Sequence, residues 1–435
     1  MQRSKSLLQM GVVVLLTTLI ISCQKEMLND ETGVPELKMA QTDGLTDLQL
    51  LGKNIYFDKI SSPENMACAG CHDPGLGFTG PNPGINLKGS VYRGAVPHRF
   101  GNRKPPSAAY AAFSPVLHID EEGIFEGGNF WDGRATGEHF LLNPDAVMLE
   151  GMGLPSAEQA LGPFLNPVEQ NAPSKEDVLM QIAASKYAWL WEEVWGEPPG
   201  WASGAETDRN YDRVGVAIAA YEGSTEVNPF TSKFDAYMRG EAELTEQEAR
   251  GLMLFEAEDK GNCTACHPSR AEEHEGHHML PLFTDFTFDN LGVPKNPDNP
   301  FYSMDKVYLD DGTPINPMGK DWVDLGLGGF LQSHPNPEWM AMAGENMGKQ
   351  KVPTLRNVGK MKGNGFIKAY THNGYFKSLK ELVHFYNTRD VEPWPAPEVA
   401  QNVNTNELGN LGLTGEEEDA IVAFLLTLSD GYTGN

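Results

Sequence analysis

The chain has 435 residues, enough for two or three ordinary domains. Hydrophobic residues make up 40% and charged residues 21%, which excludes an intrinsically disordered chain. The formal net charge of −27 argues against nucleic acid or an anionic membrane surface as a partner, and fits a basic redox protein or small neutral substrates better. The 30 prolines and 46 glycines indicate long irregular loops between rather few helices.

The first 22 residues have the pattern of a secretory signal peptide. Arg3 and Lys5 precede an apolar stretch, 7–21, that is too short for a membrane-spanning helix. The stretch ends in Ser22-Cys23, which resembles a bacterial lipobox, so we expect a lipid on Cys23 that anchors the mature protein to a bacterial membrane in the periplasm. An ordinary signal peptide with an incidental cysteine is the alternative. Residues 23–42 are polar and patternless and are interpreted as a tether.

Four of the five cysteines form two identical units. These are Cys68-Ala69-Gly70-Cys71-His72 and Cys263-Thr264-Ala265-Cys266-His267. Cys-x-x-Cys-His is the attachment signature of c-type haem, in which the two thiols hold the porphyrin and the histidine ligates the iron. A zinc site or a thioredoxin-like pair is the weaker reading, because both copies carry the histidine and the export signal supplies an oxidising compartment.

A similar helix is expected before each unit. Thr46 with Gln49, and Thr245 with Glu248, form capping boxes, which begin helices. Apolar residues follow each box at roughly helical spacing. A third capping box begins a closing helix within 413–429. We therefore predict a mainly α fold with two cytochrome c-like domains, each with one covalent c-type haem, and long irregular loops. The predicted domains cover 43–235 and 236–430.

An ordered set of short motifs now resembles one family, the bacterial di-haem cytochrome c peroxidases, which include the methylamine-utilisation (MauG-type) enzymes. The resemblance runs from about residue 45 to 429. Beyond the two haem units, its motifs are Tyr56-Phe57-Asp58, Phe130-Trp131-Asp132-Gly133-Arg134, Asn166-Pro167-Val168-Glu169, Phe288-Asp289-Asn290-Leu291-Gly292, Pro353-Thr354-Leu355-Arg356-Asn357 and His372-Asn373-Gly374.

The resemblance implies that the first haem, with His72 below its iron, reacts with peroxide. It places Glu169 as the carboxylate above that iron, with Gln159 and Pro163 in the matching spacing before it. A carboxylate in this position can take a proton from one peroxide oxygen and return it to the other. Without the family resemblance, Glu169 is interpreted as a surface residue in a proline-rich loop.

The resemblance also implies an electron-transfer role for the second haem, with His267 as one ligand. Trp131 falls where the family places an indole between the two haems, although it reads equally well as a core anchor. The peroxidases have a methionine as second ligand, and Tyr386 stands at that position here, as in the MauG-type enzymes. The alternative is that Tyr386 only packs, while His384 or a methionine (Met347, Met361) binds the iron.

Two further ligands are open. His98 lies near the position of a removable ligand of the first haem, and is otherwise an ordinary loop histidine. Relatives also bind Ca²⁺ between the domains through a loop asparagine, whose counterpart here is Lys104, or Asn102 in a shifted register.

Three functions follow from these patterns. The first is reduction of hydrogen peroxide to water, with electrons from a small periplasmic cytochrome c or cupredoxin. The second is a MauG-type oxidase that uses peroxide to oxidise a residue on a partner protein. The third is a non-enzymatic di-haem electron carrier or peroxide sensor. A homodimer is left open, and contact with the membrane is expected only through the lipid on Cys23.

Overall fold

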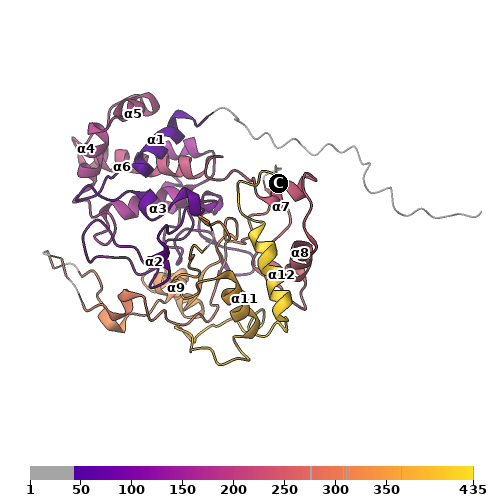
Figure 1. The fold of residues 1–435 in the computed structure, drawn as a ribbon. Coiled ribbons are helices and arrows are strands. Elements are labelled where there is room, and N and C mark those ends of the chain that lie inside the picture. Colours follow the sequence, from indigo (N-terminus) through magenta and orange to yellow (C-terminus); the bar gives the residue numbers. More distant parts are fainter. Residues whose placement is uncertain are drawn as a thin grey trace, which may run out of the picture.

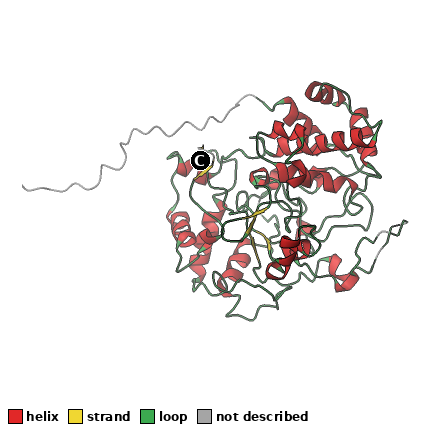
Figure 2. Ribbon diagram, turned by 180° about the vertical axis from the view of Figure 1, so that it is seen from behind, coloured by secondary structure: helices red, strands yellow, loops and turns green. Residues whose placement is uncertain are grey.

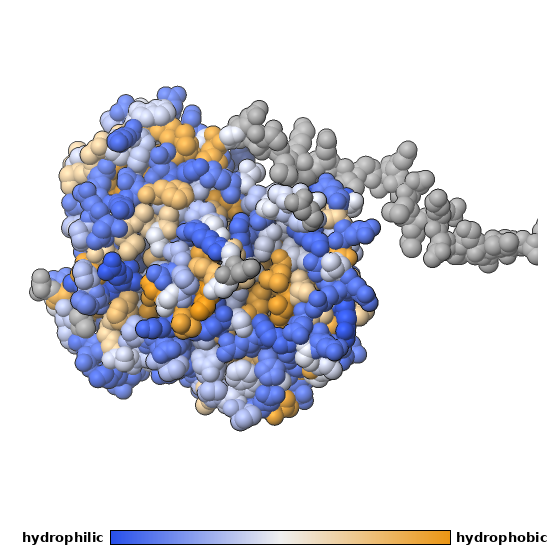
Figure 3. All heavy atoms as spheres, in the orientation of Figure 1, coloured by the Kyte–Doolittle hydropathy of each residue, from blue (hydrophilic) through white to orange (hydrophobic). Residues whose placement is uncertain are grey.

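The computed structural model describes residues 44–434 except 275, 276, 307, 310, 313 and 364. The predicted signal peptide, the lipid-bearing Cys23 and the tether lie outside the described residues. Within that part of the chain, no helix is long and apolar enough to cross a membrane. The face drawn in Figure 3 is covered mostly by hydrophilic residues, with separate hydrophobic areas between them.

The fold is mainly helical, as predicted, and long loops separate the helices (Figures 1 and 2). The α-helices are α1 (Asp47–Phe57), α2 (Pro83–Asn86), α3 (Leu154–Leu165), α4 (Lys175–Ala184), α5 (Ala188–Trp195), α6 (Gly204–Glu222), α7 (Lys233–Met238), α8 (Glu246–Glu256), α9 (Gly326–Leu331), α10 (Pro337–Ala341), α11 (Leu379–Thr388) and α12 (Gly415–Leu426). Three short antiparallel pairs join β1 (His118–Ile119) to β2 (Phe125–Glu126), β3 (Glu272–His274) to β4 (His277–Met279), and β5 (Phe288–Asp289) to β6 (Gln350–Lys351).

The three predicted capping boxes are confirmed. Thr46, Thr245 and Thr414 each accept a hydrogen bond from the third backbone N–H of their helix, and the residue at that position bonds back. These contacts satisfy N–H groups that have no partner inside the helix, so α1, α8 and α12 begin where the sequence indicates.

These helices pack around two hydrophobic cores. In the first, α1 and α3 pack against α6, with α4 and α5 beside them. In the second, α8 packs against α12, and α7 and α11 complete it. Gly52 and Gly251 lie at the two main crossings, where a Cβ atom would collide with the backbone of Ala217 and of Ala420. The absence of a side chain therefore lets each helix pair approach closely.

A third cluster connects segments of both predicted domains. It includes Leu117 just before β1, Phe125 of β2, Phe288 of β5, Leu327 of α9 and Trp339 of α10. Helix α7 runs across the predicted boundary at 235. The division into 43–235 and 236–430 stays a prediction.

A buried ion pair beside the second core also contacts aromatic rings of the first core. Arg356 donates to both carboxylate oxygens of Asp235, at 3.1 and 2.9 Å, and the two side chains are 1% and 0% exposed. The guanidinium group also lies over the rings of Tyr110 and Phe230, at 4.9 and 4.4 Å from their centroids. Burial opposes the charge on Asp235, but Arg356 holds the pKa of this carboxyl below its ordinary value.

We expect Asp235→Ala to lower the free energy of unfolding by about 3–5 kcal/mol, because it removes the carboxylate that pairs with the buried charge of Arg356. Urea denaturation followed by circular dichroism measures the change. Asp305→Ala is the control, since it removes a largely exposed partner of Lys320 and should change the free energy by less than about 1 kcal/mol. Equal midpoints for Asp235→Ala and the parent protein would contradict this prediction.

Candidate functional site

Both Cys-x-x-Cys-His units form the same local structure. The first cysteine of each pair begins a short 3₁₀ turn, Cys68–Gly70 or Cys263–Ala265, and the second cysteine follows that turn directly. The backbone N–H of His72 donates to the carbonyl of Cys68 at 3.0 Å, and that of His267 to Cys263 at 2.9 Å. None of these four cysteines forms a disulfide, so no such bond competes for their sulfur atoms.

The two histidines of these units are prepared to act as neutral ligands. Nδ1 of His72 lies 3.1 Å from the carbonyl oxygen of Phe78, and Nδ1 of His267 lies 2.7 Å from that of Phe283. A carbonyl accepts only from a protonated nitrogen, so Nε2 is left with a free lone pair. Burial lowers the pKa of both imidazoles to about 4, which keeps them uncharged at neutral pH.

Each unit lines its own hollow in the protein. The first contains Cys68, Cys71 and His72 and has a cavity volume of about 220 Å³. The second contains Cys263, Cys266 and His267 and has a cavity volume of about 190 Å³. Apolar side chains make up much of both linings, which suits a large apolar cofactor.

A thin wall separates the two hollows. Trp131 and the segment 351–354 line both of them. The indole is 8% exposed, its Nε1 donates to the carbonyl of Lys104 at 2.8 Å, and its ring meets that of His372 edge-on at 6.4 Å between centroids. Trp131 thus lies between the hollows, and it is also firmly packed.

The first hollow collects the acid–base residues expected from sequence. Gln159 and Pro163 lie four residues apart on α3 and line it together with Glu169. Glu169 follows α3 in a tight turn, in which its N–H donates to the carbonyl of Asn166 at 3.0 Å. Burial raises the pKa of the Glu169 carboxyl, and Arg134 offsets part of the rise.

His98 has a different position. Its side chain is exposed, its backbone has a φ of 66°, and it is not among the residues that line the first hollow. In this conformation His98 is no ligand of a group bound there.

In the second hollow, Tyr386 on α11 faces the space beside His267. Burial, followed by the nearby Cys266 and Asp289, raises the pKa of its phenol well above the ordinary value. The alternatives lie elsewhere. His384 pairs with Glu418 and Glu392 at 2.8 and 3.3 Å. Met347 packs in the third cluster, and Met361 is exposed. Of the four candidates, only Tyr386 lines the hollow.

The polar groups around the wall suit an anionic occupant. The ammonium group of Lys104 donates to Thr79 Oγ1 and the Pro105 carbonyl, and that of Lys351 donates to the carbonyls of Gly127 and Phe286, with the carboxylates of Asp285 and Glu126 nearby. Burial lowers their pKa values to about 8 and about 7. Nε2 of the buried His372, which lines the second hollow, has no hydrogen-bond partner. Lys104 and Lys351 would pair with haem propionates, so these two cations fit the predicted cofactor.

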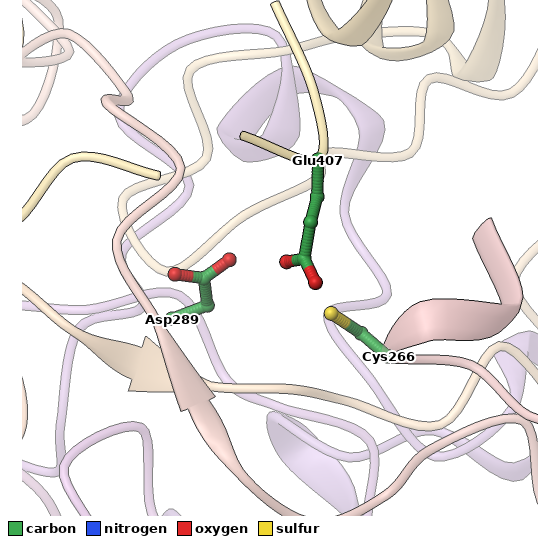
Figure 4. A group of neighbouring side chains, drawn as sticks. All are labelled: Cys266, Asp289 and Glu407. Carbon is green, nitrogen blue, oxygen red and sulfur yellow. The ribbon is translucent and has the colours of Figure 1, made fainter. Parts of the chain in front are cut away.

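One group of potential metal ligands was found among the described residues. Cys266, Asp289 and Glu407 have ligand atoms within 4.8 Å of one another (Figure 4). Because Cys266 is one of the predicted attachment cysteines, this group belongs to the second hollow. Lys104 is buried and its side chain is a cation when protonated, so it does not itself supply a calcium ligand.

Sequence reasoning missed some residues of these hollows. No motif or pattern in the sequence marks Lys351 or Glu222, because each is a single charged residue within an otherwise ordinary segment. His372 was quoted as part of a motif but given no role. Their positions depend on contacts between segments far apart in the chain.

Comparisons with known proteins point to one family. Residues 46–243 match the family model described as di-haem cytochrome c peroxidase. The methylamine utilization protein MauG of Paracoccus denitrificans is 33% identical over 399 residues, which cover 88% of either chain. The cytochrome-c peroxidase IdrP2 of Denitromonas iodatirespirans is 24% identical, with 91% of this chain and 84% of the relative covered. The crystal structure of the diheme peroxidase BthA from Burkholderia thailandensis superposes with a TM-score of 0.67 at 30% identity, covering 88% of this chain and 86% of that one.

Proposed function

The chain belongs to the di-haem cytochrome c peroxidase family and is an oxidoreductase, and on this premise we propose that it reduces hydrogen peroxide to water with electrons from a small periplasmic redox protein. The observation that carries the proposal is the pair of hollows, each with a Cys-x-x-Cys-His unit, separated by Trp131. We also propose that the mature protein is periplasmic and anchored through a lipid on Cys23.

Each hollow would hold one haem c. Cys68 and Cys71 would form thioethers to the first, with His72 as iron ligand. In the second hollow, Cys263 and Cys266 would form the thioethers, and His267 and Tyr386 would ligate the iron. When bound, the haems supply redox-active iron that exchanges single electrons with the donor and with peroxide.

The protein's own groups move the protons. Glu169 accepts a proton from one oxygen of peroxide and returns it to the other, which makes that oxygen a better leaving group. Gln159 and Pro163, one helical turn apart on α3, shape the wall beside it. The indole of Trp131 carries electrons across the wall between the hollows. An acidic surface attracts a basic donor and speeds its approach at low salt.

Steady-state consumption of peroxide tests this function. The purified haem-loaded protein is mixed with hydrogen peroxide and a reduced basic cytochrome c, and oxidation of the cytochrome is followed by absorbance. We expect two cytochromes oxidised per peroxide, with a rate that falls as salt is added. Reduced cytochrome that stays reduced in the presence of peroxide would contradict the proposal.

Oxidation of a residue on a partner protein is the second candidate. It is favoured by Tyr386, because an anionic phenolate ligand lowers the haem potential and makes the second haem a poor store of electrons from a donor. The identity of 33% with a MauG protein supports it as well. This second candidate predicts that a partner protein changes in mass when it is mixed with the haem-loaded protein and peroxide in the absence of a cytochrome.

If Tyr386 ligates the iron of the second haem, its replacement should change the redox potential of that haem. Tyr386→Met should raise the midpoint potential of the second haem by on the order of 0.1 V or more, within the ~0.8 V that axial ligands span. Spectroelectrochemical titration measures it. Tyr370→Phe is the matched control, since Tyr370 lines the same hollow but its hydroxyl lies 3.3 Å from the carbonyl of Val358. If both variants keep the parental potential, Tyr386 is not a ligand.

A further inference from the structure

Helix α6 ends in a buried glutamate that the proposed chemistry leaves unused. Glu222 is its last residue, is 4% exposed and lines the first hollow, as does Ile218 one turn earlier. Its carboxyl shares a hydrogen bond with the hydroxyl of Ser156, and no cation contributes to its surroundings. A buried carboxyl without a positive partner is uncommon, because the charged form is strongly disfavoured away from water.

Glu222 and Glu169 both line the first hollow, and one face of helix α3 lines the hollow between them. Ser156, Gln159 and Pro163 follow one another at helical spacing on α3 and all line the first hollow. Glu222 contacts the beginning of this face at Ser156, and Glu169 follows its end. Helices α3 and α6 pack directly against each other, so the arrangement is part of the first core.

The surroundings keep Glu222 protonated. The titratable groups that face it are Tyr56 of α1, Cys68 of the first unit and its neighbour Tyr221, and none of these is cationic. Burial raises the pKa of Glu222 to about 8, against a lowering by Ser156. The C-terminal end of α6 carries a partial negative charge, which acts in the same direction as burial. At neutral pH this side chain is therefore an acid with a proton to give.

The proton balance of the reaction calls for such an acid. Hydrogen peroxide, two electrons and two protons give two molecules of water. Glu169 takes a proton from one oxygen and returns it to the other, so it adds no net proton. The two electrons come from the small redox protein, and both protons have to reach the oxygen atoms in the first hollow.

We propose that Glu222 is the second acid of the first hollow, donating one of the two net protons to the water that forms there and regaining it from solvent. The inference rests on the proposed peroxide reduction and deepens it. In the step itself, the O–H bond of Glu222 breaks, an O–H bond of water forms, and the carboxylate is left to be reprotonated.

The haem-loaded Glu222→Gln variant tests this role. Glutamine has the size of a neutral glutamic acid and can keep the hydrogen bond to Ser156, so the fold should be retained. Glu193→Gln on α5 is the control, because Glu193 is exposed. We expect peroxide consumption to fall about 10²-fold in Glu222→Gln and to stay at the parental rate in Glu193→Gln. Glu222→Asp, which keeps an acid, should retain more activity than the glutamine variant.

A second readout does not depend on turnover. When Glu222 loses its proton, the negative charge disfavours reduction of the nearby haem, so the midpoint potential of the first haem should fall with rising pH around pH 8, by at most about 59 mV per pH unit. This dependence should vanish in Glu222→Gln and persist in Glu193→Gln, which a purely structural role would not produce.

The outcomes separate two failures. If the parent protein consumes peroxide and Glu222→Gln does so equally fast with the same pH-dependent potential, the role of Glu222 is overturned and the proposed function stands. If the parent protein consumes no peroxide with any reduced donor, the proposed function fails, and the role of Glu222 fails with it.

Discussion

Glu169→Gln is expected to slow the reaction with peroxide by about 10²–10⁴-fold, the range that a positioned general acid–base group contributes. Glutamine matches glutamate in size and keeps the wall of the first hollow intact, but it cannot carry a proton from one peroxide oxygen to the other. Stopped-flow absorbance of the haem-loaded protein, mixed with a range of peroxide concentrations, gives the second-order rate constant.

The pH dependence of this rate gives a sharper test. Glu169 has to be ionised to accept the first proton, so the rate should fall on acidification. Burial raises the pKa of the carboxyl, so the fall should begin at a higher pH than for an ordinary glutamate, whose pKa is about 4.3. The Glu169→Gln variant should lack this dependence.

Glu158→Gln is the matched control for Glu169. Glu158 lies on the same helix α3, and burial raises its pKa too, but it accepts a hydrogen bond from the N–H of Gly137 at 2.6 Å and does not line the hollow. Its variant should react with peroxide at the parental rate. A parental rate in Glu169→Gln would leave the acid–base role to another group of the first hollow.

Local signals explain how much of the fold could be predicted from sequence. The helices that begin at Thr46, Thr245 and Thr414 were predicted correctly, because a capping box is a contact between residues three positions apart. The mainly helical class with long loops follows from the same local patterns together with the proline and glycine content. The family prediction is confirmed as well.

The wall between the hollows shows where sequence reasoning stops. Trp131 was placed between two haems only through a family resemblance, and the backbone of Lys351, which donates to its carbonyl at 2.8 Å, is 220 residues further along the chain. The environment of Glu222 is likewise made by α1, α3 and the first cysteine unit. Such neighbours are set by how helices pack, which no periodicity within one segment reports.

Removal of one cysteine pair should remove one haem and leave the other. In the doubly substituted Cys263→Ser, Cys266→Ser variant, no thiol is left in the second hollow to bind porphyrin covalently, so the mass of the denatured protein should exceed that of the bare chain by one haem in place of two. The variant Cys68→Ser, Cys71→Ser should lose the other haem, and all four substitutions together should give a colourless protein. Mass spectrometry after denaturation reads the number directly.

The same variants report on stability, because a cofactor held only by the folded protein adds its binding free energy to that of folding. The second hollow is bordered by the helices of the second core, α8, α11 and α12. Loss of its haem should therefore destabilise α8–α12 packing more than the first core, and hydrogen exchange of the two regions should diverge. If the double variant at 263 and 266 kept two covalent haems, or if the parent protein carried none, the proposed assignment of both hollows to covalent haem would be wrong.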